Sequence, residues 1–305
     1  MSDNLTVYAK LADVITGLMK GLDVKKVTVD HASVEYLEAG EGEPIIFLHG
    51  FGGLNFQWRY WLDTLKGGYR VIAVTIPDLS PTLNFDKPHY SFRKYAEWLA
   101  LFLEKLAIRE AHLVSHCTGA CIAAFYASLN PGKLTTLTLI APPNIGLPAD
   151  EQRATTFDKA DLFEGMNAQI IDEIKAQSYY SAPFIPVMIL KIISKRIEKN
   201  KDKVLFLLGE LSRSSRVLSK RLTLIDTPTL IIGGQQDAFL SDPDALLMMS
   251  ELIPECELVF LPECGYFPFQ EQCDACLAVV RSFVEQGRLP QWAYESLPAM
   301  RQSPP

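Results

Sequence analysis

The chain has 305 residues, of which 48% are hydrophobic, and it carries a formal net charge of −7 at pH 7. This size is sufficient for one α/β domain with an inserted subdomain, and the acidic balance argues against a nucleic-acid partner. No apolar run reaches the length of about eighteen residues that crosses a bilayer. Residues 1–30 lack the features of a signal peptide, so we expect a cytoplasmic location.

The N-terminal region predicts an element that precedes the sheet. Apolar residues recur at helical spacing between residues 5 and 22, which indicates an extra helix within residues 1–24. This helix either packs on the protein's own core or docks against a partner or membrane. Strands are then expected at 33–38 and 44–48.

The second of these strands ends in the turn His49-Gly50-Phe51-Gly52-Gly53. Its glycines allow the backbone to approach a ligand oxygen closely, whereas His49 is expected to be a packed, structural imidazole. A helix at 55–65, a strand at 70–76 and an amphipathic helix at 90–106 follow. The loop before that last helix holds His89, which could reach the mouth of a pocket.

The stretch from Leu113 to Ala120 carries the chemistry. The apolar run 111–114 predicts a strand, and a helix-forming run begins at 121, so Cys117 lies at the tip of a sharp strand–turn–helix. Such a turn exposes its central side chain beside converging N–H groups, which suits nucleophilic attack on a carbonyl. His116 should face away from Cys117, because adjacent side chains point to opposite sides.

The alternation of strands and helices stops between residues 144 and 222, after a strand at 135–140. Residues 182–190 are apolar, and from Lys191 to Arg221 there are ten Lys or Arg against three Asp or Glu. Through residues 184–221 this region could contact an anionic membrane or an acidic protein. Alternatively, its apolar face covers a pocket and its charges are solvated.

Regular alternation resumes with a strand at 228–233, followed by Gly234-Gln235-Gln236-Asp237. A helix at 243–252 and a strand at 257–261 precede Gly265-Tyr266-Phe267-Pro268. A helix is expected at 270–284; it contains a Cys-x-x-Cys pair, Cys273 and Cys276, which we interpret as packed thiols because no histidine lies nearby to complete a zinc site. We expect no metal or other cofactor. Residues 287–305 form a Pro-rich tail.

These motifs, in this order over residues 33–286, resemble the α/β-hydrolase superfamily, with Ser115-x-Cys117-x-Gly119 in place of the usual G-x-S-x-G elbow. The resemblance implies a mostly parallel central sheet with helices on both faces. The core would comprise residues 25–143 and 223–286, and a helical cap would occupy 144–222.

The same resemblance implies roles for individual residues. Cys117 would be the nucleophile and Asp237 the acid, and the backbone N–H groups of Phe51 and Thr118 would form an oxyanion hole for a small carbonyl ligand. The turn glycines Gly50 and Gly52, together with the side chains of His49, His89 and His116, would border the pocket.

The expected base is absent from its usual position. The superfamily places a histidine after the acid, but this chain has Tyr266 there, and none of its five histidines follows residue 116. A phenol with a pKa of about 10 is a poor base, although it could hydrogen-bond Asp237 or donate to a ligand oxygen. A thiol is already partly ionised at pH 7, and a helix N-terminus is expected to lower the pKa of Cys117 further.

Three interpretations remain open from the sequence. The protein is a ligand- or partner-binding protein with little hydrolase activity, which the absent histidine favours. Alternatively, it is a Cys117-dependent ester or thioester hydrolase or acyltransferase. A third possibility is a lyase or isomerase with Tyr266 as proton donor. Residues 265–269 and the apolar cap segment also resemble maspardin, a family with this fold and an incomplete triad that is thought to act by binding proteins.

Overall fold

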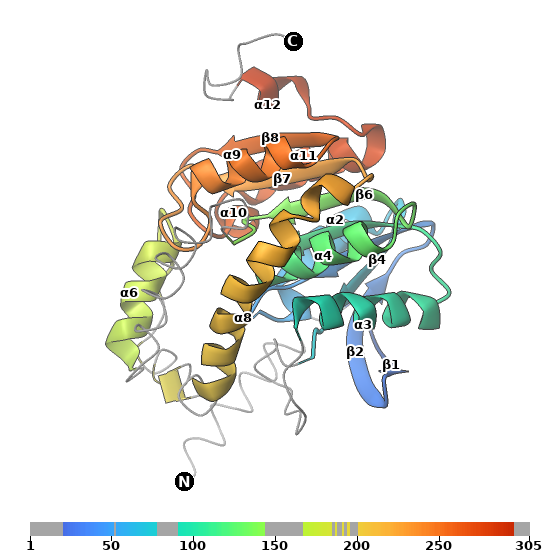
Figure 1. The fold of residues 1–305 in the computed structure, drawn as a ribbon, viewed down its shortest axis with the longest axis horizontal. Coiled ribbons are helices and arrows are strands. Elements are labelled where there is room, and N and C mark those ends of the chain that lie inside the picture. The colour runs from blue at the N-terminus through green and yellow to red at the C-terminus, as the bar shows by residue number, and fades with distance from the viewer. Residues whose placement is uncertain are drawn as a thin grey trace.

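A computed structural model describes residues 21–51, 53–77, 91–143, 167–184, 187, 191, 194–195 and 201–295. Within them, helices cover both faces of one central sheet, as Figure 1 shows. Of the sequence predictions, the first twenty residues of the N-terminal helix, Gly52 and His89 lie outside the described residues. The sheet and its helices confirm the predicted α/β-hydrolase fold class.

The described strands form an eight-stranded sheet in the order β1-β2-β4-β3-β5-β6-β7-β8. Pairing is antiparallel between β1 and β2 and between β2 and β4, and parallel across the rest of the sheet. The strands are β1 (Asp23–Val29), β2 (Ala32–Ala39), β3 (Glu43–Leu48), β4 (Tyr69–Val74), β5 (Ala111–His116), β6 (Leu134–Ile140), β7 (Thr229–Gly234) and β8 (Cys256–Leu261).

Two apolar clusters fill the space between the sheet and its helices. Successive residues of β3 alternate between them, with Ile46 and Leu48 in one cluster and Ile45 and Phe47 in the other. A parallel strand buried on both faces reads as a continuous apolar run for this reason. The first cluster includes residues of α3 (Phe92–Lys105), α4 (Thr118–Leu129) and α9 (Pro243–Leu252); the second includes residues of η1 (Asn55–Trp58), α2 (Arg59–Leu65), α10 (Pro268–Glu271) and α11 (Cys273–Gln286).

The structure corrects the prediction for the start of the chain. Residues 23 and 24, expected in the N-terminal helix, begin β1, and Gly21 before them has a positive φ of 88°. Sequence patterning missed β1 because most of its side chains are exposed at the sheet edge. In the tail, residues 291–295 form the short helix α12 (Gln291–Glu295), where Ala293 is buried.

The helix expected at 270–284 is divided into two. The short α10 ends at Glu271, and α11 begins at Cys273 after Gln272, whose φ of −119° and ψ of 50° are not helical. Within α11, Cys276 is buried in the second apolar cluster and Cys273 packs at its edge. Among the described residues, no cluster of His, Cys, Asp or Glu has the composition of a metal site.

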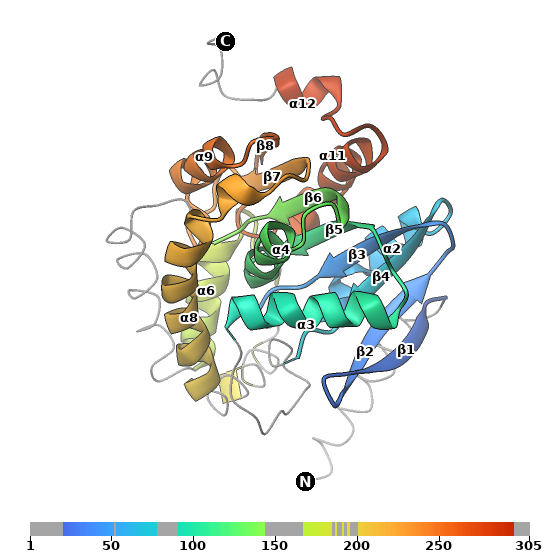
Figure 2. The same cartoon turned by 45° about the vertical axis from the view of Figure 1, so that its right-hand side comes forward.

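Two described helices of the inserted region lie on one side of the core. They are α6 (Ala168–Ser178) and α8 (Lys201–Ser219), and Figures 1 and 2 place both on the same side of the core. Leu211 and Leu218 of α8 are buried in the first apolar cluster together with α4. The inserted region is therefore packed directly on the helix that follows Cys117.

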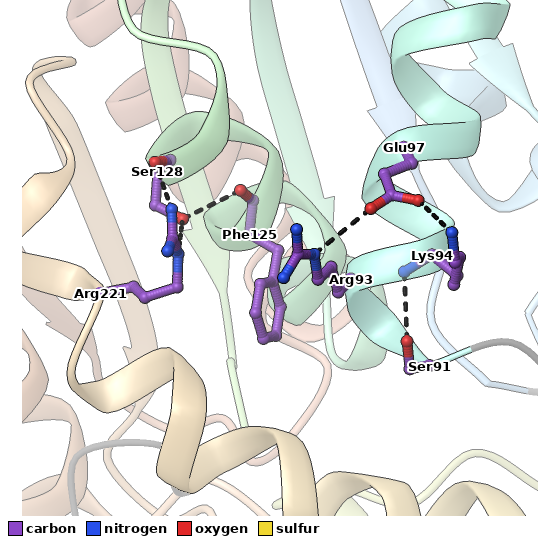
Figure 3. Close-up of polar contacts among 7 residues, drawn as sticks. All are labelled: Ser91, Arg93, Lys94, Glu97, Phe125, Ser128 and Arg221. Atoms are coloured by element: carbon purple, nitrogen blue, oxygen red, sulfur yellow. Dashed lines mark hydrogen bonds and ion pairs between the residues drawn. The ribbon is translucent and has the colours of Figure 1, made fainter.

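The side chain of Arg221 forms hydrogen bonds to the last turn of α4, as Figure 3 shows. Arg221, just after α8, donates from Nε to Ser128 Oγ at 3.1 Å and from Nη2 to the Ser128 carbonyl oxygen at 2.8 Å. Ser128 lies in the last turn of α4, where the helix dipole favours a cation. The same view shows the start of α3, where Ser91 Oγ accepts from the Lys94 N–H at 3.3 Å and caps the helix.

Candidate active site

The chain turns sharply from β5 into α4 at Cys117. This residue has φ of 56° and ψ of −128°, a conformation that costs a non-glycine residue about 1–3 kcal/mol and tends to occur at functional sites. The Cys117 N–H donates to the Ile140 carbonyl at 3.1 Å, and its carbonyl accepts from the Ala120 N–H at 2.8 Å. These bonds hold the thiol-bearing residue at the carboxyl end of the sheet, at the start of α4.

Two glycines allow the turn to pack against the loop after β3. A Cβ added at Gly119 would lie 2.5 Å from the His49 carbonyl oxygen, and one added at Gly50 would lie 2.5 Å from Cys117 Cβ. Such distances are far shorter than carbon and oxygen atoms tolerate. Because a residue larger than glycine would not fit at position 50 or 119, the two glycines allow the loop that carries Phe51 to lie close to the backbone at Cys117.

The predicted oxyanion-hole residues meet at the sulfur. The N–H groups of Phe51 and Thr118 both interact with the Cys117 thiol. The Phe51 N–H also donates to Thr118 Oγ1 at 2.8 Å, which ties the loop after β3 to the first residue of α4. Two backbone donors thus lie next to the Cys117 thiol, and one of them, the Phe51 N–H, is also bonded to the Thr118 hydroxyl.

The thiol itself is less acidic than the sequence suggested. Burial raises the pKa of Cys117 above its ordinary value of 9.0, although the Tyr266 hydroxyl and the N–H groups of Thr118 and Phe51 partly offset this. The prediction of a lowered pKa is therefore wrong. The N-terminal amides of α4 do favour the thiolate, but the cost of burying a charge is larger.

Tyr266 occupies the space beside the sulfur. Its ring is buried, with the Phe239 ring in edge contact at a centroid distance of 5.3 Å. Burial, followed by the interaction with Cys117 and the charge of Asp237, raises the pKa of the phenol well above 10.0. The hydroxyl interacts with the sulfur and makes no hydrogen bond to Asp237. It therefore stays protonated, and its O–H can donate a hydrogen bond to the sulfur.

Asp237 lies behind Tyr266, in the loop after β7. Its Oδ1 accepts from the Phe239 N–H at 2.7 Å, which fixes the carboxyl group in the turn. Burial is the main cause that raises the pKa of Tyr266 and that of Cys264, and the negative charge of Asp237 adds to both increases. The structure thus brings Cys117, Tyr266 and Asp237 into one electrostatically connected group.

Two predicted pocket histidines are bound to the backbone. His49 Nε2 accepts from the Ile76 N–H at 2.9 Å, so Nδ1 carries the proton and donates to the Gly50 carbonyl at 2.7 Å. His116 Nε2 lies 2.9 Å from the Tyr266 carbonyl oxygen, to which it donates. Burial lowers the pKa of both rings to about 4, so both are neutral at pH 7. The groups with the largest influence on the pKa of the Cys117 thiol in the described part of the chain include no histidine.

The end of α6 is fastened to the loop that carries Tyr266, a contact that sequence reasoning missed. The Tyr266 N–H donates to the Ser178 carbonyl at 2.8 Å, and the Tyr179 ring stacks on Phe267 at 4.7 Å. Glu271 accepts from the N–H groups of Gly265 at 2.8 Å and Ser181 at 2.9 Å. The sequence feature that relates to this contact is Gly265. A Cβ at this position would lie 2.6 Å from the Ser178 carbonyl oxygen, so the close approach requires glycine.

The immediate surroundings of the sulfur are apolar. Cys117, Ala141 and Tyr266 form a small buried cluster, against which Phe239, Leu240 and Phe267 pack. These side chains offer hydrocarbon and aromatic surface, and the polar groups that act on the sulfur include the hydroxyls of Tyr266 and Thr118 and the backbone amides of Phe51 and Thr118. The arrangement suits a carbonyl group attached to an apolar chain.

The fold and the site together define the class of protein. The sequence model of the α/β hydrolase fold family matches residues 43–272, and this chain belongs to that family. None of the described helices is both long enough and apolar enough to cross a membrane.

Known relatives extend this comparison. The chain is 24% identical to monoacylglycerol lipase ABHD6 of Homo sapiens, covering 80% of this chain and 77% of the relative. It is 25% identical to Lipase 3 of Moraxella sp., covering 82% and 81%. The structure resembles that of a membrane phospholipase A with a TM-score of 0.77, at 23% identity over 92% of this chain and 91% of that one. The resemblance to maspardin stays a prediction.

Proposed function

We propose that this protein is a Cys117-dependent acyl hydrolase or acyltransferase that acts on carboxylic esters or thioesters with an apolar acyl group. The strained elbow carries the proposal: Cys117 is held at φ 56° with two backbone amides directed at its sulfur. The relatives named lipases are ester hydrolases by name, which favours this interpretation over a non-catalytic protein. The apolar cluster around the sulfur supports the proposed acyl group.

The chemistry follows from the groups at the site. The Cys117 sulfur adds to the carbonyl carbon, and the negative charge that develops on the oxygen is stabilised by the Phe51 and Thr118 amides. Collapse of this tetrahedral intermediate forms a thioester on Cys117 and breaks the bond between the carbonyl carbon and the alcohol oxygen. The alcohol leaves with the proton of the original thiol. Tyr266, protonated and next to the sulfur, is placed to relay that proton. Water or a second alcohol then cleaves the thioester and restores the thiol.

The second step is expected to be slow. Activating water requires a general base, and the two described histidines next to the elbow, His49 and His116, are bonded to the backbone and have pKa values lowered by burial to about 4. General acid–base assistance is typically worth about 10²–10⁴-fold in rate. We therefore expect the acyl group to accumulate on the enzyme, so that the first turnover is faster than those that follow.

The test is a set of p-nitrophenyl esters of increasing acyl length, followed by nitrophenolate release. We expect a burst of close to one equivalent and then slow turnover, both absent in Cys117→Ala. Cys256→Ala is the control, because its thiol is partly exposed and lies outside the elbow. Equal release by the wild type and Cys117→Ala would contradict the proposal.

The pH dependence of the burst rate is a separate prediction. Because burial holds the pKa of Cys117 above 9.0, the thiolate fraction should rise about tenfold per pH unit throughout the range below that value. We therefore expect the rate constant of the burst to increase from pH 6 to pH 9 without a plateau. A plateau between pH 6 and pH 8 would show an ionised thiol at neutral pH and contradict the assignment.

One observation favours a second function, reversible binding of an acyl ligand without turnover. The Cys117 thiol is buried and neutral, and Tyr266 occupies the space next to it. Such a site could hold a carbonyl compound between the amides and the phenol. The nitrophenolate assay separates the two functions, because a binding protein would show neither burst nor turnover while still protecting Cys117 from alkylation.

A further inference from the structure

Three large apolar side chains are exposed on the segment that follows α6. Tyr180 is 54% exposed, Phe184 is 91% exposed and Val187 is 61% exposed. We call these three residues the apolar patch. Three large apolar side chains exposed within eight residues of the sequence distinguish this segment from a surface with singly scattered apolar residues.

Positive charge follows the apolar patch along the chain. Lys191 and Lys195 are exposed, and in the sequence they begin the stretch to Arg221 with its excess of seven positive charges. The whole chain carries −7. An anionic surface would therefore repel most of this protein and attract this segment, which would orient the molecule as well as bind it.

The apolar patch is attached to the loop of the candidate active site. Tyr179, immediately before Tyr180, stacks on Phe267, and the Ser181 N–H donates to Glu271 at 2.9 Å. Tyr266 immediately precedes Phe267 in that loop and borders the Cys117 sulfur. The exposed segment thus begins at the same contacts that hold the site together.

We propose that the apolar patch and the lysines that follow it dock this protein on the surface of an anionic lipid bilayer. Apolar side chains that enter the acyl boundary, next to cations that meet lipid phosphates, are the composition of an interfacial membrane anchor. Lysine suits the second role because its apolar stem can lie along the surface while the ammonium group reaches the phosphate. An acidic protein would use the charge but would not require the strongly exposed Phe184 and Val187.

Docking is independent of the chemistry at Cys117 and can be measured without it. The full-length protein is mixed with phosphatidylcholine vesicles, with or without phosphatidylglycerol, and the bound fraction is measured by sedimentation. We expect binding only to the anionic vesicles, and loss of binding near 1 M NaCl, where the Debye length falls to about 3 Å. Cys117→Ala should bind as the wild type does, so failure of the proposed reaction leaves this test intact.

A matched pair of variants tests the patch itself. Phe184→Ser/Lys191→Glu should lower vesicle affinity by about tenfold or more, since it removes the exposed aromatic group that would enter the lipid and reverses a charge near the lipid phosphates. Leu101→Ser/Lys105→Glu makes the same kind of change on the exposed surface of α3 and should leave affinity unchanged. Circular dichroism would verify that both variants are folded.

Three outcomes would overturn the proposal. The first is binding to neutral and anionic vesicles alike, or to neither. The second is equal affinity of the two double variants. The third is a stable dimer of the wild type that Phe184→Ser/Lys191→Glu converts to a monomer, because the apolar patch would then be covered by a second copy of the chain.

Discussion

Tyr266→His is expected to increase steady-state ester turnover by about 10²–10⁴-fold, the usual contribution of general acid–base catalysis. Position 266 lies beside the Cys117 sulfur and within the electrostatic influence of Asp237. An imidazole there could accept the thiol proton, with the Asp237 carboxylate stabilising the resulting cation. Nitrophenolate release after the burst measures the gain, which should appear mainly in the slow phase because deacylation lacks a base.

Tyr266→Phe is the control for this substitution. It keeps the aromatic ring and removes the hydroxyl that lowers the pKa of Cys117, so the burst should slow and turnover should not increase. An equal gain in Tyr266→Phe and Tyr266→His would show that relief of crowding is responsible. No gain in a folded Tyr266→His would mean that Asp237 and the sulfur are not aligned for a histidine at this position.

Gly119→Ala is expected to disable the elbow and weaken the fold. Its Cβ would lie 2.5 Å from the His49 carbonyl oxygen and 3.1 Å from that of Leu48. Both contacts are to backbone atoms of the core, which cannot rotate away, so the free energy of unfolding should fall by about 1–3 kcal/mol. Separating the Phe51 loop from Cys117 should also lower the burst rate by about 10²-fold.

Gly67→Ala provides the comparison, because a Cβ there would meet no atom within 4 Å. Chemical denaturation and the burst assay should give values close to those of the wild type for this variant. Wild-type stability and burst rate in Gly119→Ala would contradict the view that close packing between the loop after β3 and the start of α4 forms the site.

Local sequence signals predicted the features that depend on neighbouring residues. The apolar run before Ser115 and the small residues after Cys117 indicated the elbow. The position of Asp237 after a strand indicated its place at the carboxyl end of the sheet. The exposed, charged residues of β1 carried no such signal, because an edge strand is stabilised mainly by its backbone pairing with β2.

Tertiary effects explain what the sequence could not predict. The Ser178 carbonyl and the Tyr266 N–H that join α6 to the site are backbone atoms, so no residue type indicates their contact. The pKa of Cys117 was predicted in the wrong direction because the position of the thiol at a helix N-terminus is visible in the sequence, whereas its burial is not. The roles of His49 and His116 in backbone hydrogen bonds likewise required the fold.

The most direct test of the central claim is to locate the acyl group after a single turnover. The wild-type protein would be mixed with a p-nitrophenyl ester, quenched in acid during the burst, digested, and analysed by peptide mass. We expect one added acyl mass on the peptide that contains Cys117. An acyl group found only on other peptides, or turnover that proceeds with Cys117 unmodified and persists in Cys117→Ala, would contradict the account.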